Sequence, residues 1–362
     1  MYLKVLHIGE YVQGGVATYI NTLIKHSPKN IENYLILANE KSEHNWPLTK
    51  DHVIYYKYKR SWESIIPAMR KIQATIDDIK PDIIYIHSTW AGVMARLPYL
   101  LKNKNTKIIY NPHGWSFLME ISKYKKCIYA FIERVLANVT DVIINVSKFE
   151  YDSAVQVNIA RNKLVHIYSG ISQEIEEDNE DVHMPDNKLN LLFVGRFDKQ
   201  KGVDILLESF KNCTRRDIHL TMIGGNVLNE RAQVDKIDDD RITFLGWIPN
   251  DKLGAYYKRC DVVVMPSRWE AFGLVAIEAM KYGKPVLASN RGALPEIIRN
   301  NETGFIFDMD DNSSLENIID NLEKDKCVKM YDSIISDFKG RFTEKRMVDK
   351  TYKEFERYVE IR

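Results

Sequence analysis

The sequence has few cysteines, no long apolar run and almost no net charge. Its cysteines, Cys127, Cys213, Cys260 and Cys327, lack the short paired spacing of zinc or redox sites, so we expect reduced thiols and no bound metal. No apolar stretch approaches the roughly 18 residues that a membrane-spanning helix needs, and a strand begins too soon after Met1 for a signal peptide. The 51 basic and 50 acidic residues leave a formal net charge of +1, which gives no general attraction to nucleic acid. We therefore expect a cytoplasmic globular protein without a nucleic-acid partner.

The first half of the chain alternates short β-branched runs with stretches of helical periodicity. This alternation predicts a parallel sheet with helices on both faces. The predicted strands of this half are Val5–Ile8, Tyr34–Ala38, Ile83–His87, Lys107–Asn111 and Asp141–Val146.

The same pattern restarts at Leu189, after an acidic and irregular segment from Gln173 to Asn187. The predicted strands of the second half are Leu192–Gly195, His219–Gly224, Ile242–Leu245, Asp261–Met265, Pro285–Ala288 and Gly304–Phe307. A length of 362 residues favours two domains. We therefore predict an α/β fold with two Rossmann-like, doubly wound domains, residues 1–180 and 181–340, and a cleft between them.

A polar helical tail follows, and we expect residues 341–362 to pack back on the N-terminal domain. Between about Thr343 and Ile361, apolar residues recur at spacings near three and four, which predicts an amphipathic helix. These residues are Met347, Val348, Tyr352, Phe355, Tyr358 and Val359.

The strongest functional signal follows the predicted strand that ends near Met265. A loop leads into a helix there, and the amides of Phe272, Gly273 and Leu274 would point toward an anion such as a diphosphate. Glu270 on the loop can reach sugar hydroxyls, and Glu278 within the helix can accept hydrogen bonds from ribose hydroxyls. Alternatively, the two carboxylates are an ordinary N-terminal helix charge and a solvated helix residue.

A second loop carries cations at the equivalent place in the first strand-to-helix turn of the second domain. Arg196 and Lys201 lie beside Gly195 and Gly202, and they suit a diphosphate leaving group, on which negative charge grows during glycosyl transfer. They would take the place of a metal ion. A solvated basic loop is the simpler alternative, and the nearby carboxylate loop makes it less favoured.

Two weaker signals lie in the first domain. Gly14 and Gly15 follow the first strand, but their spacing departs from GxGxxG, which disfavours a dinucleotide site. His113 precedes Gly114 at the end of another strand, where an imidazole could hydrogen-bond a sugar hydroxyl or steady developing charge. A purely structural histidine is the alternative.

Taken together, these motifs resemble the GT-B glycosyltransferases of family 4, a large retaining group, over essentially the whole chain. Glu270 and Glu278 match the family's pair of glutamates separated by seven residues. The resemblance implies that a nucleotide sugar, with UDP as the first choice of nucleotide, donates to a polysaccharide or lipid-linked acceptor without a metal. It implies retention through same-face attack, in which the donor phosphate helps to deprotonate the acceptor.

The resemblance also assigns roles to individual residues. It implies that Glu270 contacts the donor sugar, that Glu278 contacts the ribose, and that His113 lies at the reacting sugar. The remaining implied contacts are Arg196, Lys201 and Gly15 at the diphosphate, with Gly14 beside it, and the backbone near Ile248 at the base. This chain departs from the family with Ala271 after Glu270, and with Tyr168–Ile171 in place of a commoner Asn-Gly pair.

The N-terminal half is locally basic and aromatic. Between Val53 and Arg134, 14 lysines and arginines stand against 6 acidic residues, an excess of 14 − 6 = 8 positive charges. The interleaved aromatics are Tyr55, Tyr56, Tyr58, Trp62, Trp115, Phe117, Tyr124 and Tyr129. This mixture suits a peripheral enzyme on an anionic lipid surface, and a solvated basic face is the alternative.

Three other functions remain as rivals. A nucleotide-sugar 2-epimerase of the same fold would need different acid and base carboxylates. A noncatalytic nucleotide-sugar-binding subunit could keep the same motifs. A nicotinamide oxidoreductase is disfavoured because the dinucleotide fingerprint is absent.

Overall fold

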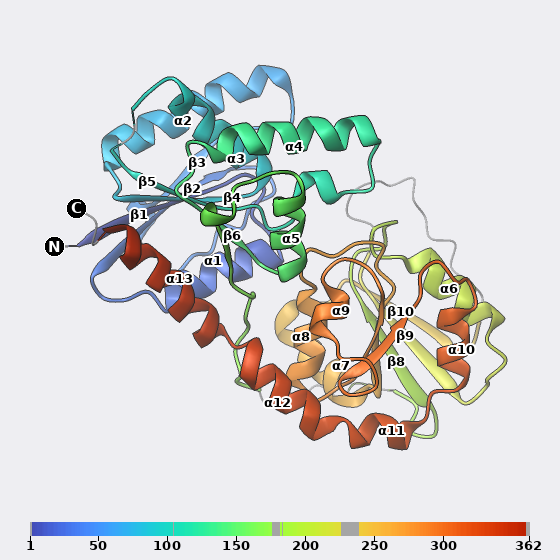
Figure 1. Ribbon diagram of the computed structural model, residues 1–362. Helices are drawn as coiled ribbons and strands as arrows, with labels where there is room; N and C mark the ends of the chain where they lie inside the picture. Colours follow the sequence, from blue (N-terminus) through green and yellow to red (C-terminus); the bar gives the residue numbers. More distant parts are fainter. Residues whose placement is uncertain (1, 104, 176–181, 183, 226–238, 360–362) are drawn as a thin grey trace. The chain divides into compact units, whose positions relative to one another are not determined.

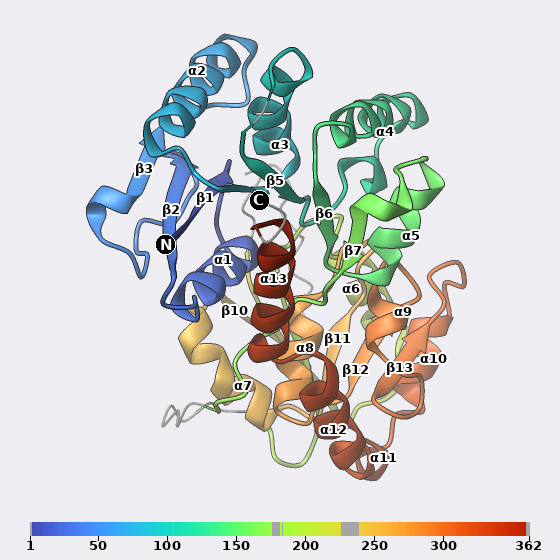
Figure 2. The same cartoon turned by 60° about the vertical axis from the view of Figure 1, so that its left-hand side comes forward.

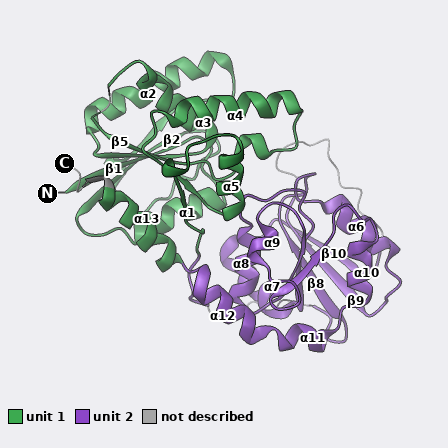
Figure 3. Ribbon diagram, viewed as in Figure 1, with its two compact units in different colours: residues 1–170, 344–362 green, residues 171–343 purple. Residues whose placement is uncertain are grey.

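In the computed structural model, the chain forms two compact units, each built on its own parallel sheet (Figures 1 and 3). The structure describes residues 2–103, 105–175, 182, 184–225 and 239–359. The first unit comprises residues 1–170 and 344–362, and the second comprises residues 171–343. The division therefore lies before the expected boundary at 180/181, and residues 344–362 belong to the first unit.

The sheet of the first unit has seven strands in the order β3-β2-β1-β4-β5-β6-β7, all parallel. The strands are β1 Leu3–Gly9, β2 Ile31–Ala38, β3 Val53–Tyr56, β4 Ile83–His87, β5 Lys107–Asn111, β6 Val142–Asn145 and β7 Leu164–His166. Its α-helices are α1 Gly15–Lys25, α2 Trp62–Ile79, α3 Thr89–Arg96, α4 Lys123–Ala137, α5 Lys148–Gln156 and α13 Glu344–Val359. Its 3-10 helices are η1 Lys50–His52, η2 Leu97–Leu100, η3 Ser116–Leu118 and η4 Arg161–Lys163.

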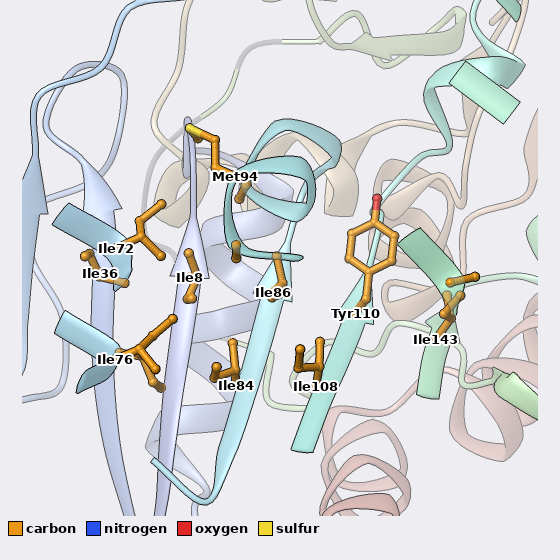
Figure 4. Packing of buried hydrophobic residues seen from close by; sticks show 14 of the residues in the cluster. Ile8, Ile36, Ile72, Ile76, Ile84, Ile86, Met94, Ile108, Tyr110 and Ile143 are labelled. Carbon is orange, nitrogen blue, oxygen red and sulfur yellow. The ribbon is translucent and has the colours of Figure 1, made fainter. Parts of the chain in front are cut away.

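Alternate residues along these strands pack on opposite faces of the sheet. Leu6 and Ile8 of β1 lie in a cluster with residues of α2 and α3, part of which is drawn in Figure 4. Val5 lies in the other cluster, with residues of α1 and α13. Both clusters are buried, so the sheet is covered on both faces, as the sequence predicts.

Helix α13 completes the second of these clusters, beside α1 (Figure 2). Its residues Met347, Val348, Tyr352 and Phe355 are buried there, and the Tyr352 hydroxyl donates to the carbonyl of Leu23, 2.8 Å away. The amphipathic stripe of the C-terminal segment therefore packs on the first unit.

The sheet of the second unit has six parallel strands in the order β10-β9-β8-β11-β12-β13. The strands are β8 Leu189–Val194, β9 Ile218–Ile223, β10 Ile242–Gly246, β11 Val262–Met265, β12 Val286–Ser289 and β13 Gly304–Phe307. The helices are α6 Val203–Asn212, η5 Asn250–Lys252, α7 Leu253–Arg259, α8 Leu274–Lys281, α9 Leu294–Ile297, α10 Ser314–Asp320, α11 Lys324–Lys329 and α12 Tyr331–Arg341.

The order of the two sheets fixes where ligands can bind. In each sheet the connections run outward from the first strand in one direction and then reverse to the other side, which is the Rossmann order. The reversal occurs between β1 and β4 in the first unit, and between β8 and β11 in the second. Ligands of such sheets bind beyond the carboxyl ends of the strands at this point. The prediction of two Rossmann-like units is confirmed.

Candidate functional site

The two loops singled out in the second half of the chain are the loops at its reversal point. Residues 195–202 connect β8 to α6, and residues 266–273 connect β11 to α8. The backbone N–H of Arg268 donates to the carbonyl of Gln200 at 2.8 Å, and the Gln200 amide donates to the carbonyl of Trp269 at 3.3 Å. The two loops therefore lie against each other.

Gly202 allows this close approach. Its backbone has φ +69, and a Cβ added there would lie 1.9 Å from the carbonyl oxygen of Pro266. No side chain larger than hydrogen fits without moving the neighbouring loop.

Glu270 and Lys201 join the two loops through an ion pair. Lys201 Nζ lies 2.5 Å from Glu270 Oε1, and the side chains are 19% and 8% exposed. The Ser267 hydroxyl also donates to Glu270 Oε1 at 3.0 Å. An ionised carboxylate can accept about four hydrogen bonds, so Oε2 retains acceptor capacity for a ligand hydroxyl.

The loop after β12 contacts the backbone of Glu270. The amide of Ala293 donates to the Glu270 carbonyl at 3.0 Å. Gly292 has φ +59, and a Cβ there would lie 2.3 Å from the same carbonyl oxygen. The backbone of Glu270 is thus held between the loop that carries it and the loop that follows β12.

Arg196 and Glu278 complete the candidate set of this region. Arg196 donates to the Gln200 side chain at 2.8 Å and pairs with Asp198 at 3.2 Å, and it is partly exposed. Glu278 is half-buried within α8 and accepts a hydrogen bond from the Tyr257 hydroxyl at 2.7 Å. Burial raises the pKa of Glu278, and hydrogen bonding to Tyr257 opposes this rise.

The predicted anion cradle is the start of α8. Gly273 is its N-cap, Phe272 is buried, and no side chain in the described parts of the chain caps the helix with a hydrogen bond. Leu274 is the first helical residue. The first amides of a helix have no partner within it, so this end favours an anion.

Ile248, predicted near the base, is half-buried in the connection between β10 and η5.

In the first unit, Gly14 and Gly15 lie after β1, at the start of helix α1. Gly14 is the N-cap and Gly15 the first helical residue. The Gly14 amide donates to the Glu43 carboxylate, while burial, the larger effect, raises the pKa of Glu43. This helix start therefore already contacts one carboxylate.

His113 follows β5 in a backbone conformation that is rare for residues other than glycine. Its φ is +49, and its N–H donates to the Asn111 side chain at 3.0 Å. Such a conformation costs about 1–2 kcal/mol and is concentrated at functional sites. The ring of Tyr19 packs edge-on against the imidazole, with 4.7 Å between centroids.

Sequence reasoning missed two histidines that contact His113. His113 Nε2 lies 2.9 Å from His87 Nδ1, and His87 Nε2 lies 3.1 Å from His7 Nδ1. His7 belongs to β1 and His87 ends β4, and both are fully buried. Burial lowers the pKa of His113 to about 3 and that of His7 to about 4. The available signal was a histidine at or near the carboxyl end of three predicted strands.

The basic and aromatic face predicted for the first unit is smaller than expected. Tyr56, Tyr58, Trp115 and Phe117 are buried in the core, so they are not part of any surface. Arg96 is not part of the surface either, because its side chain is buried and pairs with Glu133 at 2.7 Å. Lys104 lies outside the described residues.

The parts of the chain that the structure describes contain no cluster of three or more histidine, cysteine, aspartate or glutamate side chains that could hold a metal ion. Cys213, Cys260 and Cys327 are buried free thiols, and Cys127 is an exposed one. None of the described helices is both long and apolar enough to cross a bilayer.

Comparison with known proteins gives matches along nearly the whole chain. The family model for glycosyl transferases group 1 matches residues 174–340, and that for glycosyltransferase family 4 matches residues 13–174. A 41.2 kDa protein in the cps region of Klebsiella pneumoniae is 37% identical over 88% of this chain and 89% of its own length. The capsular polysaccharide biosynthesis glycosyltransferase CapM of Staphylococcus aureus is 24% identical, over 83% of each chain.

Solved structures share the fold at lower identity. Anabaena HepE in complex with UDP is 19% identical, with a TM-score of 0.80 over 98% of this chain and 100% of that protein. The same protein has also been solved with UDP-glucose.

Proposed function

The chain belongs to the group 1 glycosyl transferases, and we propose that it transfers a sugar from a UDP-sugar to a polysaccharide or lipid-linked acceptor. The observation that carries the proposal is the ion pair between Lys201 and Glu270 across the two reversal-point loops. In this proposal the cation of the pair binds phosphate and its carboxylate binds sugar hydroxyls, which explains why the two lie side by side. The cps-region protein and CapM, to which the chain is similar, support polysaccharide biosynthesis as the setting. The UDP and UDP-glucose complexes of HepE support a UDP-linked donor.

The residues of the second unit bind the donor in this proposal. The diphosphate lies against the amides of Phe272, Gly273 and Leu274, with Arg196 and Lys201 as its cations. Because these cations are already charged, no metal ion is required. The ribose hydroxyls donate to Glu278, and the backbone near Ile248 holds the base. His113 accepts a hydrogen bond from the donor sugar.

The reaction proceeds with retention of the anomeric configuration. The bond between the anomeric carbon and the phosphate oxygen breaks, and its electron pair stays on the departing diphosphate. The acceptor hydroxyl attacks on the same face, and its proton passes to the phosphate oxygen. Lys201 and Arg196 stabilise the charge that develops on the leaving group, which favours the transition state over the ground state.

Turnover of a UDP-sugar tests this function directly. Purified protein, incubated with UDP-glucose, UDP-galactose and UDP-N-acetylglucosamine in the presence of EDTA, should release UDP from at least one of them, with water taking the sugar in place of the natural acceptor. We expect Glu270→Ala to lower kcat at least tenfold, because it removes sugar contacts, while UDP still binds. Binding of UDP without release from any donor would favour a noncatalytic subunit, and formation of a 2-epimer without UDP release at steady state would favour the epimerase.

We also propose that the first unit contacts an anionic membrane through α4. Tyr124, Ile128 and Phe131 are exposed at helical spacing along α4, with Tyr124 76% and Phe131 57% exposed. Lys123, Lys125, Lys126 and Arg134 lie on the same helix. An apolar ridge among cations suits the interface of an anionic bilayer. This contact would bring a cytoplasmic enzyme to a lipid-linked acceptor.

Vesicle sedimentation separates this proposal from a solvated basic face. Vesicles with phosphatidylglycerol should retain the protein at modest salt, and the variant Tyr124→Ser/Phe131→Ser should lose retention. Val328→Ser, at an exposed residue of α11, is the matched control and should not change it. Equal retention of all three proteins, or none by the unaltered protein, would contradict the membrane contact.

A further inference from the structure

Three histidines and one asparagine form a continuous hydrogen-bonded column from the interior of the first unit to His113. The column runs from His113 Nε2 to His87 Nδ1 at 2.9 Å, from His87 Nε2 to His7 Nδ1 at 3.1 Å, and from His7 Nε2 to Asn33 Oδ1 at 3.1 Å. The ring planes of His7 and His87 differ by 11°, and those of His87 and His113 by 23°, as suits hydrogen bonds that lie in the ring planes. These four residues come from β2, β1, β4 and the turn after β5, which are neighbours in the sheet.

Burial keeps the whole column neutral at ordinary pH. It lowers the pKa of His7 to about 4 and that of His113 to about 3, and it also lowers the pKa of His87, which His113 and His7 depress further. A neutral imidazole carries one N–H and one lone pair. Each ring must therefore donate to one neighbour and accept from the other, so one end of the column determines the proton position at the opposite end.

Asn33, at the interior end of the column, determines which ring nitrogen of each histidine carries the proton. Its Oδ1 faces His7, and its Nδ2 donates to the Ser27 hydroxyl at 2.8 Å. A carbonyl oxygen can only accept, so His7 carries its proton on Nε2 and offers Nδ1 to His87. His87 therefore donates from Nε2 to His7 and accepts at Nδ1. The donor to that Nδ1 is His113, which carries its proton on Nε2.

We propose that this column holds His113 as the Nε2–H tautomer, so that Nδ1 presents a fixed lone pair to a hydroxyl of the donor sugar. The inference rests on the proposed function for the identity of the ligand. Asn33, His7 and His87 are positioning residues that act through His113. Nδ1 makes no hydrogen bond to another residue within the described part of the chain.

The surroundings hold the His113 ring in the orientation that this role requires. The Asn111 side chain accepts from the His113 backbone N–H, and Tyr19 packs edge-on against the ring. The Tyr19 hydroxyl in turn pairs with that of Tyr85 at 2.8 Å. Tyr85 packs against Phe355 of α13, with 5.4 Å between ring centroids. Because ring plane and tautomer are both fixed, a hydroxyl donor meets an oriented acceptor without reorganisation.

The tautomer can be measured without any substrate. In long-range ¹H–¹⁵N NMR spectra of the full chain with ¹⁵N-labelled histidine, we expect His7, His87 and His113 each to show the Nε2–H pattern. An Nδ1–H pattern for His113, or an average of the two forms, would overturn the proposal.

Asn33→Leu is the variant that removes the fixed end of the column. We expect a mixed tautomer at His113 and about a tenfold loss in turnover of UDP-glucose, the size of one hydrogen bond, with the Kd of UDP unchanged within twofold. Tyr34→Phe, one residue along β2, is the matched control and should preserve both the tautomer and the turnover. Unchanged tautomer and turnover in Asn33→Leu would refute the role of the column.

This experiment distinguishes a failure of the histidine column from a failure of the proposed function. If the unaltered protein shows the Nε2–H pattern but releases no UDP from UDP-glucose, the column stands and the choice of donor fails. If it turns over UDP-glucose but shows the other pattern, the proposed function stands and the column fails.

Discussion

Replacing Lys201 by methionine should destabilise the second unit, because it leaves the buried carboxylate of Glu270 without its cation. The two side chains are only 19% and 8% exposed, so water can replace little of the lost interaction. Removing one partner of a buried ion pair costs about 3–5 kcal/mol. The Ser267 hydroxyl continues to donate to Glu270 at 3.0 Å, which places the expected loss near about 3 kcal/mol.

A double variant shows whether the unpaired charge causes this loss. Glu270→Gln combined with Lys201→Met removes both charges, and we expect it to recover the free energy of unfolding to within about 1 kcal/mol of the unaltered protein. Urea denaturation at pH 7, followed by far-UV circular dichroism, gives the three values, and Lys199→Met controls for loss of an exposed lysine from the same loop. A free energy of unfolding for Lys201→Met within about 0.5 kcal/mol of that of the unaltered protein, the scatter of an ordinary surface substitution, would contradict this expectation.

Three further variants test the loop contact at Gly202, the burial of His7 and the role of Glu278. Gly202→Ala should cost at least about 2 kcal/mol in urea denaturation, because its Cβ would lie 1.9 Å from the Pro266 carbonyl at φ +69. Gly340→Ala is the control: among the described residues, no atom outside its own helix lies within 4 Å of its added Cβ, and alanine within α12 should stabilise by up to about 1 kcal/mol. Burial lowers the pKa of His7 from 6.5 to about 4, so the unfolded chain takes up this proton first as the pH falls. Stability that is present above pH 6.5 should therefore be lost toward pH 4, by on the order of 3 kcal/mol from this group, and His7→Gln should make the pH profile less steep. Glu278→Ala should raise the Kd of UDP about tenfold in calorimetric titration, because the ribose loses a charged hydrogen-bond acceptor.

Each of these expectations has an outcome that contradicts it. A Gly202→Ala variant as stable as Gly340→Ala would show that the two loops do not approach closely. An equal pH profile in His7→Gln would show that His7 takes up its proton at an ordinary pH in the folded state. An unchanged Kd in Glu278→Ala would remove that residue from the nucleotide site.

The fold could be predicted from the sequence wherever strands are buried on both faces. Continuous β-branched runs gave β4 and β5 with the observed bounds, Ile83–His87 and Lys107–Asn111. The strands β3 and β7 were not predicted. Both lie at the edges of their sheet, and β7 has only three residues, so neither produces a long apolar run.

The face of the first unit was predicted less well, because composition does not tell which residues turn inward. Arg96 and Glu133 were counted as surface charges, yet they are buried as a pair 37 positions apart in the chain. A buried charge is tolerated only with such a partner, and nothing in the local sequence marks the pairing.

In the candidate site, motifs within one loop could be predicted from the sequence, whereas contacts between distant strands could not. Each loop of the second unit carries its own signal, as with the glycine at 202 or the glutamate at 270. For the histidine column, the sequence shows three histidines at or near strand ends but not that they meet, because β2 and β3 intervene between β1 and β4 in sequence and lie on the other side of β1 in the sheet. Only the strand order brings His7 and His87 beside His113.

Calorimetric titration of UDP and uridine tests the claim that the loops after β8 and β11 hold the diphosphate. We expect UDP to bind the unaltered protein far more tightly than uridine does, and Lys201→Met to weaken UDP about 10- to 100-fold while the Kd of uridine stays the same. Lys199→Met should change neither Kd beyond the small effect of one exposed charge. A Lys201→Met variant that keeps the full preference for UDP over uridine would contradict the claim.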